Sequence, residues 1–144
     1  MTKILILIGP NLNMLGRREP HIYGTTSLEE TKVICENAAK KINFEIDFRQ
    51  SNYEGELVTW IQEEIDNIDG LIINAAAYTH TSIAIHDALK LLDCPIIEVH
   101  LSNPKEREAF RRISFIEPLA EHVITGKGVQ GYIEALTFLA NHIK

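Results

Sequence analysis

The sequence has few of the features that define several large classes of protein. Only two cysteines occur in 144 residues, Cys35 and Cys94, too few for a disulfide framework or a cysteine-based metal site. No apolar run approaches the length of a membrane span. Acidic residues outnumber basic ones by 20 to 14, whereas proteins that bind nucleic acid normally carry a basic patch. We therefore expect buried structural thiols, no membrane partner and no nucleic-acid partner.

Three familiar site motifs are also missing or misplaced. There is no HExxH pattern, and no carboxylate-rich cluster accompanies His80, His86 and His100, so we do not expect a metal site. A serine hydrolase would need a GxSxG elbow, which is absent. GKGVQG (126–131) satisfies the dinucleotide pattern GxGxxG, but it lies too near the end of the sequence for the acidic residue expected about 20 positions later. We interpret its glycines as a tight turn between a strand and a helix.

Composition and length indicate one globular unit. The apolar fraction is 45% and the charged fraction 24%, both ordinary for globular proteins, and 144 residues suffice to bury a core. The opening MTKILILIGPN has too short an apolar run for a secretion signal. We predict a single catalytic domain over residues 1–144, located in the cytoplasm.

Strand-like and helix-like patterns alternate along the chain. KILILI, GLIIN, CPIIEVH and HVIT are apolar runs typical of strands buried on both faces, and FEIDFRQ alternates as a half-exposed edge strand does. Helical spacing begins at Ser27, where Glu30 completes a capping-box pattern. It recurs at Leu57, Ile61, Ile65 and Ile68, from Thr81 or Ser82 to near Leu92, and from Val129 to Ile143. This order predicts an α/β fold: a five-stranded parallel sheet with helices on both faces, in flavodoxin-like order.

In such a sheet, ligands bind beyond the carboxyl ends of the strands. The segments there are rich in hydrogen-bonding side chains, which we expect to converge on one crevice: Asn11, Arg18, Tyr23, Asn52, Asn74, His80, His100 and Ser102.

GRREPHIYG (16–24) places two arginines near Tyr23 in a loop without periodic pattern. A nearby guanidinium stabilises an ionised phenol, which would make the tyrosine a usable base. A solvated polar turn would have the same composition. Arginines gather again in KEREAFRRIS (105–114), which suits either a local anion site or a salt-bridged surface.

Two further segments carry candidate chemistry. Glu98 and His100 are two apart on a predicted strand, so they share a face, where a carboxylate can orient the imidazole of a proton donor; a buried ion pair is the alternative. NAAAYTHTS (74–82) offers small residues, His80 and a helix start that attracts anions, or else a capping turn with an incidental histidine.

Taken together and in order, GPNLNMLGRREPHIYG, SNYEGEL, INAAAYTHTS, EVHLSN, FRRIS and GKGVQGY resemble the motifs of type II 3-dehydroquinate dehydratase, across nearly the whole chain. The resemblance implies a hydro-lyase of the shikimate pathway of aromatic amino acid biosynthesis. It would convert 3-dehydroquinate to 3-dehydroshikimate plus water by anti elimination through an enolate, without a Schiff base or cofactor, in a dodecamer built from trimers.

The resemblance also implies roles for single residues. Tyr23 would be the base, Arg18 the cation that favours its ionisation, His100 the acid and Glu98 the group that orients it. Asn11 would hold a water that stabilises the enolate. Asn74, the Leu101 amide and Ser102 would bind the substrate carboxylate. Its ring hydroxyls would be bound by His80, Arg111 and a neighbouring subunit's Asp87, under a lid at about residues 15–23.

The chain departs from the common family pattern at Tyr53, Ala75 and Ala76 and over residues 104–106, none of which is a proposed catalytic group. A different class of function, a noncatalytic flavodoxin-like module that binds an anionic metabolite or nucleotide, would need neither the base Tyr23 nor the acid His100.

Overall fold

A computed structural model of the chain describes residues 1–17 and 19–143. Within these residues five parallel strands form one sheet in the order β2-β1-β3-β4-β5. The strands are β1 (Thr2–Ile8), β2 (Phe44–Gln50), β3 (Gly70–Asn74), β4 (Ile96–His100) and β5 (His122–Thr125). The predicted flavodoxin-like order is confirmed.

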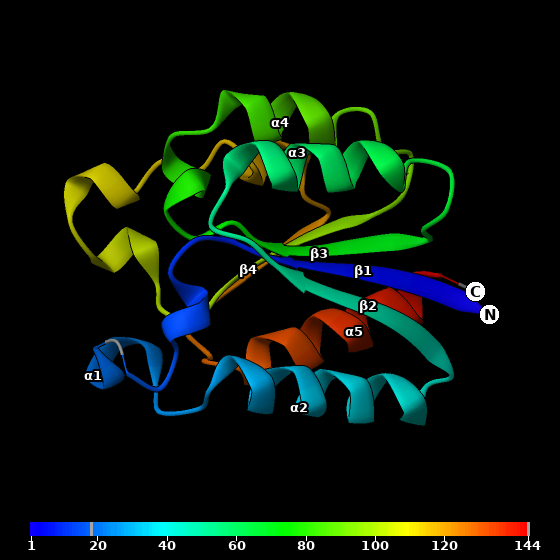
Figure 1. The fold of residues 1–144 in the computed structure, drawn as a ribbon, viewed down its shortest axis with the longest axis horizontal. Coiled ribbons are helices and arrows are strands. Elements are labelled where there is room, and N and C mark those ends of the chain that lie inside the picture. Colours follow the sequence, from blue (N-terminus) through cyan, green and yellow to red (C-terminus); the bar gives the residue numbers. More distant parts are fainter. Residues whose placement is uncertain (18, 144) are drawn as a thin grey trace.

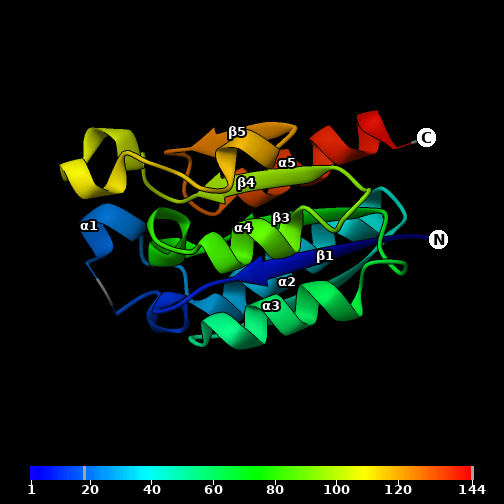
Figure 2. The same ribbon diagram turned by 90° about the horizontal axis from the view of Figure 1, so that it is seen from above.

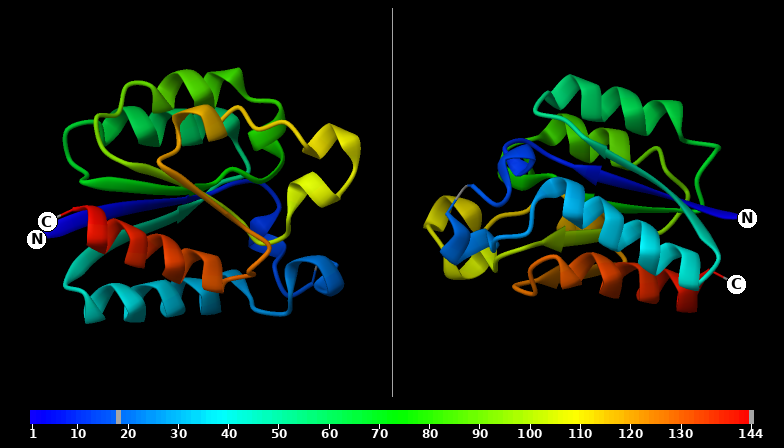
Figure 3. Two further views of the ribbon diagram at one scale, coloured as in Figure 1. Left: turned by 180° about the vertical axis from the view of Figure 1, so that it is seen from behind. Right: turned by 60° about the horizontal axis from the view of Figure 1, so that its bottom comes forward.

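Helices cover both faces of the sheet. α2 (Leu28–Lys41) and α5 (Gln130–His142) lie side by side on one face, and α3 (Glu54–Glu63) and α4 (Ile83–Leu89) lie on the other (Figure 1; Figure 3). Short helices gather beyond the carboxyl ends of the strands: η1 (Leu12–Met14), α1 (Pro20–Tyr23), η2 (Ala76–His80), η3 (Pro104–Glu106) and η4 (Ala109–Arg111). A further turn, η5 (Glu117–Leu119), precedes β5. No helix of the described residues combines the length and the apolar character needed to cross a membrane.

The core consists of two apolar layers separated by the sheet. Ile4, Ile6 and Ile8 of β1 pack toward α2 and α5, whereas Leu5 and Leu7 pack toward α3 and α4. Successive side chains of a strand point to opposite faces, so a strand covered on both sides must be apolar throughout. This is why KILILI is a continuous apolar run.

The helix starts agree with the sequence better than the helix ends do. The capping box at the start of α2 is confirmed, with Ser27 and Glu30 bonding to each other's backbone N–H. The prediction that α3 continues to Ile68 is wrong. The Asn67 side chain donates to the Glu63 carbonyl at 3.2 Å, which ends the helix in a turn that returns the buried Ile68 to the core.

Two further predictions need correction. α4 is capped by Ser82 but ends at Leu89, because the chain tightens there into a bond from the Leu92 N–H to the Leu89 carbonyl. β2 is an edge strand as predicted, but exposed and buried side chains do not alternate along it. Glu45 is exposed, and the other six residues are half-buried. Its polar side chains pack beneath α3, where Arg49 binds Glu64 at 3.0 Å.

The two cysteines have different environments. Cys35 is buried in α2 as predicted, whereas Cys94 is only half-buried; both are free thiols. Burial raises the pKa of Cys35 to about 12 and that of Cys94 to about 11. Both side chains therefore remain thiols rather than reactive thiolates at neutral pH.

The chain leaves the neighbouring strands β1 and β3 in different directions. After β1 it continues to α2 on one face of the sheet, and after β3 to α4 on the other face, so the two connections diverge at this point (Figure 2). The two strand ends also approach closely: the Gly9 N–H donates to the Asn74 carbonyl at 2.8 Å, and a Cβ on Gly9 would lie 2.4 Å from the Ala75 carbonyl oxygen. Glycine is required at position 9 because no side chain fits there.

The segment GKGVQG forms the predicted tight turn. Gly126 and Gly128 have φ of 75° and 58°, the left-handed region that glycine adopts readily. Their N–H groups donate to the carbonyls of Ser102 and Leu101. The turn thereby fixes the end of β4, where the candidate site lies.

Candidate active site

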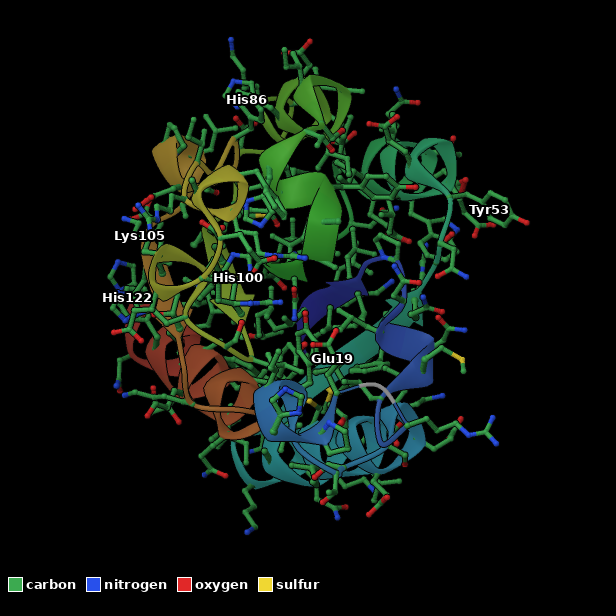
Figure 4. The ribbon with its side chains drawn as sticks, turned by 90° about the vertical axis from the view of Figure 1, so that its left-hand side faces the viewer. Glu19, Tyr53, His86, His100, Lys105 and His122 are labelled. Atoms are coloured by element: carbon green, nitrogen blue, oxygen red, sulfur yellow. The ribbon has the colours of Figure 1, made fainter. Side chains whose placement is uncertain are left out.

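A cavity of about 190 Å³ opens beyond the carboxyl ends of β1, β3 and β4. Figure 4 looks onto this edge of the molecule, with His100 near its centre and Glu19 of the opening segment below it. The cavity is lined by Pro10, Asn11, Leu12, Tyr23, Asn74, Ala76, Ala77, His80, His100, Leu101, Ser102, Pro104, Arg107 and Arg111. Side chains from five separate segments of the chain thus meet in one place.

His100 is held by a buried carboxylate. Glu98 and His100 point to the same face of β4, and His100 Nε2 lies 2.6 Å from Glu98 Oε2. Glu98 is only 1% exposed, so its charge is shielded from solvent. This contact orients the imidazole and leaves Nδ1 as the ring nitrogen available to a ligand.

Tyr23 is supported by a cation from a distant segment. It ends α1, is 8% exposed, and packs into the core layer beneath α2 and α5. Arg107 Nη1 donates to the Tyr23 hydroxyl at 2.9 Å, and the guanidinium carbon lies 5.2 Å from the ring centroid. A positive charge at this distance stabilises a phenolate oxygen, which is the form that accepts a proton.

One asparagine, Asn11, follows β1, and another, Asn74, is the last residue of β3. Asn11 adopts the left-handed conformation with φ of 69°, and its N–H donates to Asn52 Oδ1 at 3.0 Å, so its side chain remains at the cavity. Asn74 is 3% exposed; its Oδ1 accepts from the Ala76 N–H and its Nδ2 donates to the Tyr132 hydroxyl. Nδ2 carries two hydrogens, so one N–H remains for a ligand.

Ala76 has an unusual backbone for its residue type. Its φ is 52°, in the left-handed region that favours glycine. One of the departures from the common family pattern therefore falls where the backbone itself favours glycine. The methyl side chain of Ala76 takes up little of the cavity. The left-handed conformation still costs energy for any residue with a Cβ.

His80 presents a neutral imidazole. Its Nδ1 lies 2.7 Å from the Ile113 carbonyl, an acceptor, so Nδ1 carries the proton and Nε2 is an acceptor. Burial lowers the pKa of His80 below its ordinary value of 6.5, and the positive charges of His100 and Arg111 lower it further, against the opposing bond to Ile113. The ring stacks near His100 with centroids 6.4 Å apart.

The remaining lining is cationic and polar. Arg107 Nη1 also reaches Ser102 Oγ at 3.4 Å, and Arg111 Nε donates to Glu108 at 2.9 Å. Two guanidinium groups at one cavity attract an anion even though the whole chain has a net charge of −6. The cavity therefore combines an anion site with a candidate base and a candidate acid.

Comparison with known proteins agrees with this arrangement. The family model for dehydroquinase class II matches residues 2–140. A 3-dehydroquinate dehydratase from Bartonella bacilliformis is 54% identical over 143 residues, which are 99% of this chain and 90% of that protein. One from Rhizobium meliloti is 51% identical over 96% of this chain and 93% of the relative. The crystal structure of a type II dehydroquinase from Propionibacterium acnes superposes with a TM-score of 0.95 at 40% identity, covering 98% and 97% of the two chains.

The chain belongs to the class II dehydroquinases. Most of the site residues that the sequence predicts for such an enzyme meet at the cavity, and Glu98 lies directly behind it. Arg18 lies outside the described residues. Asn52, also expected in the crevice, does not line the cavity but holds Asn11.

Asp87 is not part of this cavity. It lies on α4 with an exposed side chain, on the helix that leads away from the carboxyl edge of the sheet. The role of Asp87 toward a neighbouring subunit therefore stays a prediction.

Sequence reasoning missed the position of Arg107. The sequence points to Arg18 of the opening loop as the cation beside Tyr23, and that residue lies outside the described ones. Among the described residues, Arg17 is exposed, and the cation at Tyr23 is Arg107, 84 residues away. The arginine-rich stretch 105–114 was the available signal, but which of its arginines turns inward depends on how η3 and η4 fold over the cavity.

Proposed function

We propose that this chain dehydrates 3-dehydroquinate with Tyr23 as the base and His100 as the acid. Membership of the family makes it a 3-dehydroquinate dehydratase, a hydro-lyase of the shikimate pathway. The observation that carries the proposed roles is that both residues line one cavity, each beside a group of the charge that its role needs.

The first step is removal of the proton beside the substrate ketone. A tyrosine hydroxyl is normally protonated at neutral pH, so it acts as a base only where a positive charge stabilises the phenolate. The contact between Arg107 and Tyr23 supports this role. Arg18, five residues before Tyr23 in the opening loop, is proposed as a second cation.

The second step is loss of the C1 hydroxyl from the enolate. Hydroxide is a poor leaving group, so an acid must deliver a proton as the carbon–oxygen bond breaks. His100 would donate that proton, and Glu98 would hold the imidazole in the orientation for the transfer. The described residues that line the cavity include no lysine, in keeping with a mechanism that needs no Schiff base.

The remaining groups bind the substrate. Asn74, the Leu101 amide and Ser102 are proposed to hold its carboxylate at the end of β4, within reach of the Arg107 charge. His80 and Arg111 would bind ring hydroxyls, with His80 Nε2 accepting a hydrogen bond. Asn11 would hold a water that stabilises the enolate oxygen.

Three further features complete the proposal. The opening segment, about residues 15–23, acts as a lid that brings Tyr23 to the substrate. The chains assemble into a dodecamer that is a tetramer of trimers, in which Asp87 reaches a neighbour's cavity. The enzyme works in the cytoplasm. The chain forms one catalytic domain over residues 1–144.

The decisive experiment is to mix the purified protein with 3-dehydroquinate and to follow the absorbance of the conjugated enone of 3-dehydroshikimate. Enone formation without added metal or cofactor is the expected result. Binding of 3-dehydroquinate without enone formation would favour the alternative class of function, a noncatalytic module for an anionic metabolite.

A further inference from the structure

We propose that Ser114 is a positioning residue for the general acid, acting on His100 through Glu98. The proposal rests on the roles of His100 and Glu98 given above and extends them to a residue that does not touch the substrate cavity. Ser114 lies after η4, on the far side of Glu98 from that cavity, and its Oγ is 2.7 Å from Glu98 Oε2.

The direction of this hydrogen bond follows from the other contacts of the serine. Ser114 Oγ accepts from the N–H of Ile116 at 3.1 Å and from the N–H of Glu117 at 3.0 Å. A hydroxyl has two acceptor positions and one hydrogen, so both acceptor positions are filled. The hydrogen is therefore left to point at Glu98, and the backbone of the following turn fixes its direction.

The carboxylate of Glu98 depends on this contact. Its Oε2 receives hydrogen bonds from His100 and Ser114, while Oε1 is buried without a partner among the described residues. A buried carboxylate is costly unless donors compensate its lost hydration. With one of its two donors removed, Glu98 would be free to rotate, and the imidazole that it holds would move with it.

Ser114 belongs to a segment that holds both histidines of the cavity. We call residues 113–117 the anchor segment. Its Ile113 carbonyl binds His80 Nδ1, and its Phe115 N–H donates to the Thr79 carbonyl at 2.9 Å. Ser114, between these two, binds Glu98. The anchor segment thus sets the position of His80 directly and that of His100 through a carboxylate.

The test compares Ser114→Ala with Ser114→Thr, which keeps the hydroxyl, and with Ser27→Ala, which loses a capping serine of α2 outside the cavity. In Ser114→Ala, kcat should fall about 10- to 100-fold, as expected for one lost hydrogen bond to a charged group, with KM changed less than about twofold. Ser114→Thr should recover most of kcat, and Ser27→Ala should leave kcat and KM unchanged.

A double-mutant cycle tests whether Ser114 acts on kcat through Glu98. If Ser114 acts through Glu98, its replacement in a Glu98→Gln background should change kcat far less than it does in the parent enzyme. Additive losses in the cycle, or a failure of Ser114→Thr to recover kcat, would overturn the proposal in favour of a structural role. Ser114→Cys, close in size but a weak donor, gives the same test where the alanine variant does not fold.

His100→Ala, measured in parallel, separates this proposal from the proposed function. Both His100→Ala and Ser114→Ala should retain exchange of the substrate's alpha proton with deuterated water while dehydration falls. Unchanged dehydration in His100→Ala would show that the assigned acid is wrong. A loss in His100→Ala together with normal dehydration in Ser114→Ala would reject only the role of Ser114.

Discussion

Tyr23 and His100 obtain their charged partners in different ways. Glu98 is two residues from His100 on the same strand, so strand geometry alone brings the pair together. Arg107 reaches Tyr23 from the other end of the chain, after β4 and the turns η3 and η4 have placed it. The acid is therefore organised locally, and the base depends on tertiary structure.

Replacing Tyr23 by phenylalanine should lower kcat at least about 100-fold, the usual contribution of a positioned proton-transfer group. Substrate should still bind, since the cationic and amide groups of the cavity remain. Enone absorbance and equilibrium binding measure the two effects. Tyr53→Phe is the matched control, because Tyr53 is 74% exposed and outside the cavity (Figure 4). Near-normal turnover in Tyr23→Phe would reject the assignment of the base.

Arg107→Ala should lower kcat by about 10-fold or more, because one charge-assisted hydrogen bond to the phenolate is lost. KM should rise as well, since the same guanidinium contacts Ser102. Steady-state kinetics of Arg107→Ala, Arg107→Lys and the exposed-arginine control Arg17→Ala give the comparison. A loss in Arg17→Ala equal to that in Arg107→Ala would mean that overall charge matters, not the contact with Tyr23.

His80 gives a pH prediction with a definite sign. Its pKa lies below 6.5, so the ring is neutral at pH 7 and Nε2 accepts a hydrogen bond. KM should stay constant from pH 7.5 to 6.5 and rise only as the pH falls further, when the ring gains a proton and loses its acceptor. His80→Gln should abolish that rise. A rise in KM above pH 6.5, or one that persists in His80→Gln, would contradict the role of His80.

The lowered pKa of His80 also makes the stability of the folded state depend on pH. Because the folded state binds this proton less readily than the unfolded state, His80 contributes its full share of stability above pH 6.5. That share should decline as the pH falls from 6.5 through the lowered pKa.

At the scale of elements, the close approach of β1 and β3 shapes the crevice. Gly9→Ala should lower the free energy of unfolding by about 1–3 kcal/mol, because a Cβ there would meet the Ala75 carbonyl at 2.4 Å and force the strand ends apart. Asn74 is the last residue of β3 and is proposed to bind the substrate carboxylate, so KM should rise as well. Denaturant unfolding measures the stability.

Gly55→Ala is the matched control for this change. Gly55 lies in α3, and a Cβ there would meet nothing within 4 Å, so alanine should be neutral or stabilising by up to about 1 kcal/mol. If Gly9→Ala and Gly55→Ala change the free energy of unfolding equally, the backbone around Gly9 accommodates the added Cβ without strain.

At the scale of the whole molecule, Asp87 is the residue that one chain does not explain. It is exposed on α4, outside the cavity of its own chain. If it completes a neighbour's site, activity should require assembly. Unfolding and refolding Tyr23→Phe subunits together with Asp87→Ala subunits should then restore some active sites, because a chain with Tyr23 can borrow Asp87 from its neighbour. Enone absorbance of the mixture, against each variant refolded alone, measures the recovery.

Lys90→Ala, one helical turn from Asp87 and also exposed, should not impair the enzyme and serves as the control on α4. No recovery in verified mixed oligomers, or full activity in a dilute monomer, would show that each site is complete within one chain.

The sequence by itself determined where the five strands lie along the chain, where α2 and α4 begin, and the pair formed by Glu98 and His100. Each depends on local rules: apolar runs for buried strands, a capping box at Ser27, and the two-residue period of a strand. Helix ends were less predictable, because a chain can leave a helix through several kinds of turn. α3 ends with the bond from Asn67 to Glu63, and α4 ends with the tighter turn after Leu89.

Only the tertiary structure decided that Arg107 reaches Tyr23 and that Ser114 holds Glu98. The contacts join residues 84 and 16 positions apart, and neither Arg107 nor Ser114 lies in a periodic pattern that singles it out. A cation or a hydroxyl gains its role from the groups it meets after folding. The physical reason is that hydrogen bonds and charge interactions act over a few ångströms in space, whatever the separation along the chain.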